Sequence, residues 1–390
     1  MLSSAQAFWP QRRNGVPDVT HSWLDFLDSS KIAFHEDRFR AWERGERIAP
    51  ITIDMALTRA CNYACGFCAA QYQENDRKTI TEAVMERFLT DCAEIGVRGI
   101  SLVSDGESSI SPCFEFSIRR GAELGIAMAV GSNAFVIDRE MSERILPHLT
   151  YLRVNFSGGT KERYAEIMGV KPSSYDRVCQ NISDMMAVKR ERGLTCVVGM
   201  QMVLMPQDAD QILPFAALGQ ELRPDYSIIK HCSDTPEGTL GVDYSKYAEL
   251  EDLLRQAEAM SDDEYKVVVK WSKIRAGNKR SYQRCYGPPF ILQISGSGLV
   301  APCGGTFTDK FRKFHMGNIV DESFKEIIAS DRYWEVVNHL ASEEFDASKT
   351  CDSLCLQHVT NIALDNHINK GMPMRFVPVD APRPTYTSFI

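Results

Sequence analysis

The sequence predicts an α/β protein built on a parallel sheet. Between residues 51 and 260, short runs rich in apolar and β-branched residues alternate with longer amphipathic runs. Most of the short runs are apolar on both faces, as buried parallel strands are. A strand followed by a helix, repeated six times, requires a parallel sheet that is either open or curled into a barrel. The alternation alone does not choose between these two forms.

Local signals place the individual elements. Thr81, with Glu82 behind it, is a typical helix start, and Gly96, Gly125 and Gly193 follow three amphipathic runs as typical helix stops. The expected strands cover residues 51–57, 99–103, 126–131, 151–156, 196–204 and 225–230, with 265–270 as a candidate seventh. The expected helices cover residues 81–95, 114–124, 139–146, 175–192, 208–222 and 244–260.

The chain on either side of this repeat differs from it. Helix-like stretches at 22–27 and 37–46 precede it, and the segment that holds them is too short for an independent domain. After about residue 271, the turn Gly296-Ser297-Gly298 predicts a β-hairpin over 290–301, followed by helices near 321–330 and 333–341. The expected units are a helical adapter at 1–50, the βα region at 51–275, a second region at 276–360 and a tail at 361–390, which contains several prolines and is expected to be extended from about Gly371.

Composition excludes several classes of protein. The chain has 390 residues, 44 Lys and Arg against 52 Asp and Glu, and a net charge of −8, which disfavours nucleic acid as a partner. No apolar run approaches the roughly 20 residues that span a bilayer, and the start of the sequence lacks a secretory signal. We therefore expect a cytoplasmic protein. Thiols stay reduced there, so the 12 cysteines point to metal binding rather than disulfides.

Three cysteines stand close together after the first expected strand. Cys61, Cys65 and Cys68 form a C-x3-C-x2-C motif in a short loop. Three thiolates at this spacing can ligate three corners of an iron–sulfur cube, and the fourth iron is then open to a small molecule. A zinc site with a distant fourth ligand, or three unrelated buried cysteines, are the alternatives.

The motif, its place after the first strand, and the aromatic Phe67 before the last cysteine resemble the radical S-adenosylmethionine (radical SAM) superfamily. This resemblance implies a partial (β/α)6 TIM-like barrel and a 4Fe–4S cluster on Cys61, Cys65 and Cys68. It also implies that SAM binds the open iron and is cleaved to a 5′-deoxyadenosyl radical, which abstracts hydrogen from a substrate.

Polar residues after the following strands agree with the resemblance. The family often has a Gly-Gly-Glu-Pro segment after the second strand, which contacts the SAM amino group. Here Gly106 and Glu107 match that segment, whereas Ser104, Asp105 and Ser108 depart from it. Hydrogen bonds to loop backbone are the alternative role for each polar residue. The resemblance implies cofactor contacts from Phe67, Gly106, Glu107, Ser132, Asn133, Asn155, Ser157 and Gln201.

A second set of four cysteines lies beyond the barrel. Cys285 and Cys303 flank the expected hairpin as C-x12-G-x4-C, and Cys351 and Cys355 follow as C-x3-C. The pattern resembles the auxiliary-cluster extensions called SPASM and twitch domains. A full SPASM domain has seven cysteines and two clusters, so four cysteines predict one auxiliary 4Fe–4S cluster and a twitch-like extension. A zinc ion is the alternative occupant.

Residues just past the sixth strand are candidates for the chemistry, because barrel reactions occur at the carboxyl ends of strands. Cys232 could return a hydrogen atom to a substrate radical, as an epimerase requires. Lys230 or His231 could act as a base or bind an anionic group. A polar loop that caps the strand is the alternative reading of all three residues.

These features predict a radical SAM oxidoreductase or epimerase. An auxiliary cluster with four cysteine ligands favours electron transfer, and the short adapter leaves no room for a separate peptide-binding domain. We therefore expect a small-molecule substrate of sugar or aminocyclitol type and an external electron donor such as a flavodoxin or ferredoxin. A peptide-modifying enzyme is the alternative, followed by a non-catalytic iron–sulfur or zinc protein. No nucleic acid or membrane partner is expected.

Overall fold

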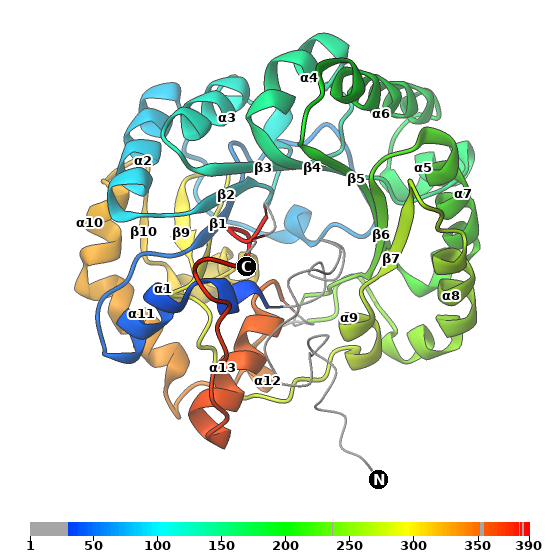
Figure 1. Cartoon of the computed structure of the whole chain (residues 1–390). Helices are drawn as coiled ribbons and strands as arrows, with labels where there is room; N and C mark the ends of the chain where they lie inside the picture. Colours follow the sequence, from blue (N-terminus) through cyan, green and yellow to red (C-terminus); the bar gives the residue numbers. More distant parts are fainter. Residues whose placement is uncertain (1–29, 236, 352–354, 382, 384–385) are drawn as a thin grey trace.

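The computed structural model describes residues 30–235, 237–351, 355–381, 383 and 386–390. Ten strands of this described chain form one sheet in the order β10-β9-β8-β1-β2-β3-β4-β5-β6-β7. The sheet curves into a barrel wall, and β10 and β7 lie at its two ends, so the barrel is not closed (Figure 1). The strands are β1 Thr52–Met55, β2 Gly99–Leu102, β3 Ala127–Ser132, β4 Leu149–Asn155, β5 Val197–Leu204, β6 Tyr226–His231, β7 Lys266–Val269, β8 Ile291–Ile294, β9 Leu299–Ala301 and β10 Gly317–Asn318.

Helices cover the outer face of the sheet (Figure 1). All six expected βα units are present, and the candidate seventh strand is β7. The parallel ladder that runs from β8 through β1 to β7 confirms the α/β fold and the partial TIM-like barrel. The helices are α1 Glu36–Glu43, α2 Glu82–Ile95, α3 Phe114–Glu123, α4 Arg139–Ile145, α5 Lys161–Met168, α6 Ser173–Arg192, α7 Ile212–Leu222, α8 Glu251–Ala259, α9 Trp271–Ala276, α10 Phe324–Ala329, α11 Asp331–Ala341, α12 Ala347–Thr350 and α13 His358–Lys370.

The structure differs from the expected helices in several places. Helix α5 was not expected, because its eight residues are too short to give a clear helical period. The expected helices at 208–222 and 244–260 each begin as a 3-10 turn, and α7 and α8 start several residues later. Helix α13 crosses the boundary that we expected at residue 360, so the first part of the tail is helical, and the helix ends at Lys370, just before the segment that we expected to be extended.

Strand register sorts the side chains that face the barrel interior into layers. Asp54 of β1 pairs with Ser101 of β2, and Asn155 of β4 pairs with Gln201 of β5. Because side chains alternate along a strand, Arg153 points the same way as Asn155, one layer nearer the amino ends of the strands. The inner face of the strands therefore carries charged and polar side chains as well as apolar ones.

The region after the barrel continues the same sheet. Strand β8 pairs in parallel with β1, and β9 and β10 follow as antiparallel strands. Helix α10 packs on α2, where the ring centroids of Phe88 and Phe324 lie 5.0 Å apart. The buried carboxylate of Asp91 accepts hydrogen bonds from the Ser323 hydroxyl (2.7 Å) and the Phe324 amide (2.8 Å). The region after the barrel is thus joined to it through both the sheet and helix α10.

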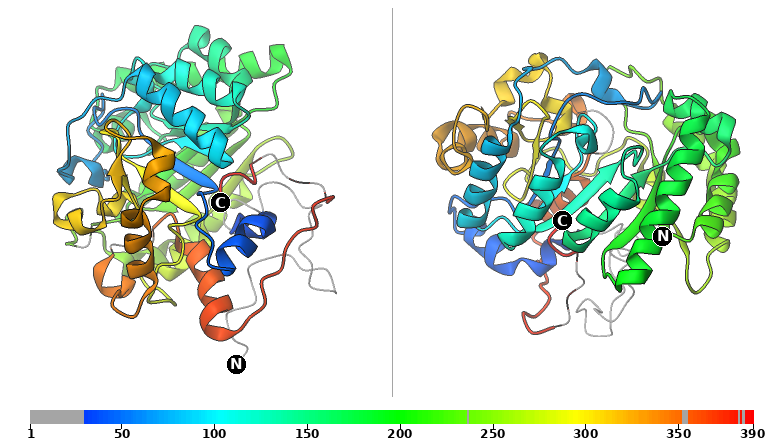
Figure 2. Two further views of the ribbon diagram at one scale, coloured as in Figure 1. Left: turned by 90° about the vertical axis from the view of Figure 1, so that its left-hand side faces the viewer. Right: turned by 90° about the horizontal axis from the view of Figure 1, so that it is seen from above.

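The last described residues lie against the amino ends of the strands. The Thr52 hydroxyl donates to the carbonyl of Ser388 (2.7 Å), and Lys31 Nζ donates to the carbonyl of Phe389 (2.5 Å). Phe39 of α1 packs on Phe376, with ring centroids 5.2 Å apart. Figure 1 and both views of Figure 2 place this end of the chain over the barrel. The expected helix at 37–46 is α1, and the one at 22–27 lies outside the described residues.

Candidate functional site

The loop that carries the first three cysteines runs between two glycines. A Cβ atom added at Gly106 would lie 1.9 Å from the carbonyl oxygen of Thr58, and one added at Gly296 would lie 2.1 Å from its carbonyl carbon. Neither position tolerates a side chain, because real Cβ atoms do not approach backbone this closely. The Gly106 position in the family segment therefore has a direct steric reason in this chain.

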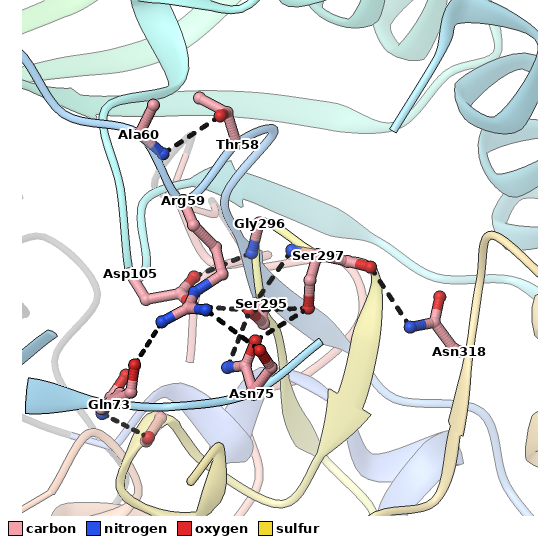
Figure 3. A network of polar contacts seen from close by, with 11 residues as sticks. Thr58, Arg59, Ala60, Gln73, Asn75, Asp105, Ser295, Gly296, Ser297 and Asn318 are labelled. Carbon is pink, nitrogen blue, oxygen red and sulfur yellow. Dashed lines mark hydrogen bonds and ion pairs between the residues drawn. The ribbon is translucent and has the colours of Figure 1, made fainter. Parts of the chain in front are cut away.

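A buried polar network holds the same loop to the β8–β9 turn (Figure 3). The Asp105 carboxylate accepts hydrogen bonds from the Ser295 hydroxyl (2.5 Å) and the Gly296 amide (2.8 Å). Arg59 Nε lies 3.5 Å from the same carboxylate, and Asn75 Nδ2 donates to Ser295 Oγ at 3.3 Å. Asp105 is one of the residues that depart from the family segment, and here it joins the cysteine loop to the second cysteine region.

The three thiols of the loop lie near one another. Cys61 is exposed, and Cys65 and Cys68 are half-buried. Burial raises the pKa of the Cys65 thiol, and the neighbouring Cys68 and Cys61 raise it further, since each added negative charge opposes the next. The amide of Gly66 donates to the carbonyl of Ile167 (3.0 Å), which fixes the loop against α5. The donor set suits a metal cluster that accepts three thiolates.

Within the described part of the chain, no three His, Cys, Asp or Glu side chains converge on one point as the ligands of a single metal ion do. In a cube of iron and sulfide, each cysteine ligates a different iron, so the thiolates need not meet at one atom. Their grouping in one loop therefore fits the cluster that the sequence predicts.

Glu107 organises the loops beside the first cysteine set. Its buried carboxylate accepts hydrogen bonds from the Ser109 hydroxyl (2.7 Å), the Ser132 hydroxyl (2.8 Å) and the Asn133 amide (2.8 Å). Asn133 Nδ2 then donates to Asn62 Oδ1 at 2.7 Å, next to Cys61. Glu107, Ser132 and Asn133, which the resemblance assigned to SAM binding, thus form one network. The Glu107 carboxylate oxygens already accept these three hydrogen bonds from neighbouring loops.

The second cysteine set is built around a buried glutamine. Gln357 Nε2 donates to the carbonyls of Ile291 (2.9 Å) and Pro302 (2.6 Å), and the Cys285 thiol donates to Gln357 Oε1 (3.2 Å). Burial raises the pKa of the Cys285 thiol, with further increases from the neighbouring Cys355 and Cys303. A single side chain therefore ties together the backbone around these cysteines.

Cys351 belongs to the same group. The pKa of the nearby Tyr282 hydroxyl is raised by burial and then by Cys355, Cys285 and Cys351. All four cysteines of the second set thus lie near one another, although they come from three separate segments of chain. Four thiols in one place fit a fully ligated cluster.

A cavity of about 410 Å³ occupies the barrel interior. Its volume falls within the range of small-molecule sites, roughly 300–1,000 Å³. Asn155, Gln201 and Lys230 line it from the barrel strands, and Cys303 and Cys355 line it from the second cysteine set. The cavity therefore connects the carboxyl ends of β4, β5 and β6 with the second cysteine region.

Charged groups face this cavity from several strands. Burial lowers the pKa of Lys230 to about 7, and the nearby Lys273 and Arg153 lower it as well. Burial raises the pKa of Asp54 to about 7, against the opposing effect of Arg153, Lys230 and Lys31. Both groups therefore change charge near neutral pH. Arg153 Nε donates to Tyr226 Oη at 2.8 Å, and its guanidinium lies over the Tyr151 ring.

Two of the three candidate catalytic residues lie behind the cavity wall. Cys232 is fully buried, and its thiol points to the carbonyl of Phe67 in the cysteine loop (3.7 Å). His231 is buried between Tyr244 and Tyr247, and burial lowers its pKa to about 3, so it stays neutral. The described lining includes Lys230 but not these two residues.

The remaining polar candidates take different positions. Gln201 Nε2 donates to Asn155 Oδ1 (2.7 Å), and both side chains line the cavity. Ser157 is fully buried, and its hydroxyl accepts from the amide of Val203 (3.0 Å). Ser157 thus stabilises the end of β4 through a backbone contact.

Sequence reasoning missed Asp54, Arg153 and Tyr226, which face the cavity. Asp54 and Arg153 are the only charged residues of their parallel strands, β1 and β4. A charge in such a strand has to face a polar interior, because burial without a polar environment is costly. That signal was present in the sequence. The role of Gln357 could not have been found in this way, because its contacts come from residues more than fifty positions away.

Comparison with known proteins gives two family matches. The model of the radical SAM superfamily matches residues 55–218, and the model of an iron–sulfur cluster-binding domain, SPASM, matches residues 285–356. Together they contain all seven cysteines of the two sets.

Solved structures share the fold. Streptococcus suis SuiB bound to S-adenosylmethionine aligns with a TM-score of 0.59 and 17% identity over 77% of this chain and 71% of that chain. SuiB bound to precursor peptide SuiA aligns with a TM-score of 0.58 and 16% identity, over 78% and 71%. Native anSMEcpe with bound AdoMet aligns with a TM-score of 0.56 and 14% identity, over 82% and 98%. No described helix has the length and apolar character needed to cross a membrane.

Proposed function

The chain belongs to the radical SAM superfamily and has a C-terminal SPASM domain, and we propose that it dehydrogenates a small molecule bound in the barrel cavity. Its cofactors are SAM and 4Fe–4S clusters. We assign the SAM-binding cluster to Cys61, Cys65 and Cys68. We assign one auxiliary cluster to Cys285, Cys303, Cys351 and Cys355.

The first cysteine set would hold the cluster that, together with SAM, supplies radical hydrogen abstraction, and the second cysteine set would hold a cluster that can accept one electron. The residues of the chain do the rest. Asn155 and Gln201 present their amide groups at the carboxyl ends of β4 and β5, where they position the substrate next to SAM. The cavity walls keep bulk water from the reacting carbon.

One observation carries the choice of dehydrogenation. Cys303 and Cys355 line the same cavity as Asn155 and Gln201, so a substrate there lies next to the ligands of the auxiliary cluster. An electron acceptor next to the substrate is well placed to take up the electron that dehydrogenation releases. Epimerisation instead needs a hydrogen donor that reaches the substrate, and the Cys232 thiol points to the Phe67 carbonyl.

Lys230 is the group that we assign to proton transfer. Its side chain lines the cavity, and its pKa of about 7 means that a large fraction of Nζ is unprotonated at neutral pH. An unprotonated amine can accept the proton that the substrate loses when it becomes oxidised. Cys232 and His231 then act as supports for the cysteine loop and for the end of β6.

A peptide substrate is the second candidate. It is favoured by solved structures of the same fold that contain peptides, namely SuiB with precursor peptide SuiA and anSMEcpe with the Cp18Cys peptide. The small-molecule assignment rests on the cavity volume of about 410 Å³, which holds a drug-sized ligand. A peptide would insert one side chain into the same cavity, so both candidates share this site. We further propose that the enzyme acts in the cytoplasm with a flavodoxin or ferredoxin as electron donor.

Isotope transfer tests the proposal. Anaerobic holoenzyme is incubated with SAM, reductant and deuterated candidate substrates, and 5′-deoxyadenosine is analysed by mass spectrometry. Deuterium in 5′-deoxyadenosine, together with a product two mass units lighter than the unlabelled substrate, is expected. Deuterium transfer with an epimer as the product would reject dehydrogenation. Transfer from peptides but from no small molecule would favour the second candidate.

A further inference from the structure

The barrel cavity has an excess of positive side chains. Lys31, Arg153, Lys270 and Lys273 line it as cations and Lys230 is partly protonated, against the single carboxylate side chain of Asp54 among the described lining residues. A site with this balance attracts a negatively charged ligand, since like charges in a low-dielectric space repel one another.

Some of these cations have other roles. Lys273 Nζ donates to the carbonyl of Cys355 (3.3 Å), so it lies where the thiolates of the auxiliary cluster add negative charge. Lys31 Nζ donates to the carbonyl of Phe389 at the amino ends of the strands (2.5 Å). Neither contact involves Arg153 or Lys230, which come from the middle of the barrel wall.

Arg153 has a free hydrogen-bonding edge. Its Nε donates to Tyr226 Oη (2.8 Å), and the guanidinium carbon lies 5.2 Å from the Tyr151 ring centroid. Nη1 and Nη2 make no hydrogen bond or ion pair with any described residue. Two parallel N–H groups held in this way match the two oxygens of a carboxylate or phosphate. The tyrosines therefore fix the orientation of an arginine that is ready to bind an anion.

Lys230 and Asp54 also have ionisable ends without a hydrogen-bond partner among the described residues. Within the described residues, neither Lys230 Nζ nor the Asp54 carboxylate forms a hydrogen bond or a direct ion pair. Three ionisable groups thus face one cavity without pairing with one another. Such groups are costly in a protein interior unless a ligand supplies their partners.

We propose, on the basis of the assigned function, that the substrate is a small molecule whose carboxylate or phosphate is bound by Arg153 and whose hydroxyl or amino group donates to Asp54. Arg153 lies two residues before Asn155 on β4, which places it about 7 Å deeper in the barrel. The anionic end of the substrate then lies deep, and a carbon a few bonds away reaches the level of Asn155 and Gln201. Lys230 lies one layer above Asn155 and Gln201, next to that carbon.

Equilibrium dialysis with two anions tests this site. The reconstituted holoenzyme with SAM is dialysed against labelled inorganic phosphate and, separately, labelled tartrate, which carries carboxylates and hydroxyls. We expect one saturable site per chain for at least one of them. R153Q should weaken its binding at least tenfold, and R153K less, because lysine keeps the charge and loses the paired donors. R139Q, on the outer surface, should bind like the wild type.

The affinities for phosphate and for tartrate together identify the chemical class of the anion. Tighter phosphate binding indicates a phosphate ester, and tighter tartrate binding a hydroxy acid. If R153Q fails to fold, Y226F replaces it, and a threefold or greater loss is expected because the orientation of Arg153 is lost. Wild-type affinity for both anions in the folded variants, or no saturable binding in the wild type, would overturn the proposal.

SAM cleavage is measured in the same samples. Cleavage without saturable anion binding would reject the anion site and leave the radical function standing. Saturable anion binding without any SAM cleavage would reject the function and leave the anion site standing.

Discussion

The Asp105 carboxylate accepts a hydrogen bond of 2.5 Å from the Ser295 hydroxyl, 190 positions away in the sequence. Asp105 follows β2, and Ser295 follows β8, so the bond joins the barrel to the hairpin of the auxiliary region. The Gly296 amide donates to the same carboxylate, and Gly296 contacts the cysteine loop at Thr58. The two cysteine regions are thus parts of one structural unit.

Removing the Ser295 hydroxyl should destabilise the protein. S295A leaves the buried Asp105 carboxylate without one donor, and hydrogen bonds to charged groups contribute about 1.5–3 kcal/mol. We expect the free energy of unfolding to fall by about that amount in chemical denaturation. S245A is the matched control, because the exposed Ser245 donates to Asp243 at the surface and should lose less than about 1 kcal/mol. Equal losses of unfolding free energy in S295A and S245A would show that the hydrogen bond to Asp105 stabilises the protein no more than a surface hydrogen bond does.

Replacement of Cys303 should reduce product formation and leave SAM cleavage intact. In C303A, one ligand of the auxiliary cluster is lost, and the iron content should fall from about eight to about four per chain. We expect 5′-deoxyadenosine to form while product formation falls at least tenfold, as chromatography of both compounds would show. The matched control is C179A, a half-buried cysteine on α6. Full product formation by C303A would contradict the electron-acceptor role.

Replacement of Cys232 separates two reactions. Its thiol faces the carbonyl of Phe67, so C232A should keep substrate turnover within about threefold of the wild type, after correction for cluster content. An epimerase that uses this thiol would instead cleave SAM and stop before product. Loss of product with SAM cleavage intact would therefore replace the dehydrogenation proposal with epimerisation.

The charge of Asp54 should make stability depend on pH. Its pKa is raised from 3.8 to about 7 in the folded state, so folding binds a proton between these values and becomes less favourable as pH rises through them. D54N removes this effect. D54N should therefore have a higher unfolding free energy than the wild type. This difference should grow from pH 4 to pH 7, by at most about 1.4 kcal/mol per pH unit, and stay constant above pH 7. Urea unfolding at pH 5 and pH 8 measures it, and an equal gain at both values would refute the burial of a charge at Asp54.

The sequence predicted the barrel well because its strands are continuous apolar runs and its helices end at glycines, as at Gly96 and Gly193. Both cysteine sets were also visible as spacings. The interior was harder to predict, since Arg153 and Tyr226 meet only when β4, β5 and β6 are placed side by side. Cys232 looked like a cavity residue from its place after β6, and side-chain alternation alone could not reveal that the thiol turns to Phe67.

Anaerobic SAM cleavage tests the central claim most directly. Purified protein with reconstituted clusters is reduced and given SAM, and 5′-deoxyadenosine and methionine are quantified beside a variant in which Cys61, Cys65 and Cys68 are all alanine. The account predicts equal amounts of both compounds from the wild type and none above background from the variant. Cleavage that persists in the variant, or a fully loaded wild type that leaves SAM intact, would contradict it.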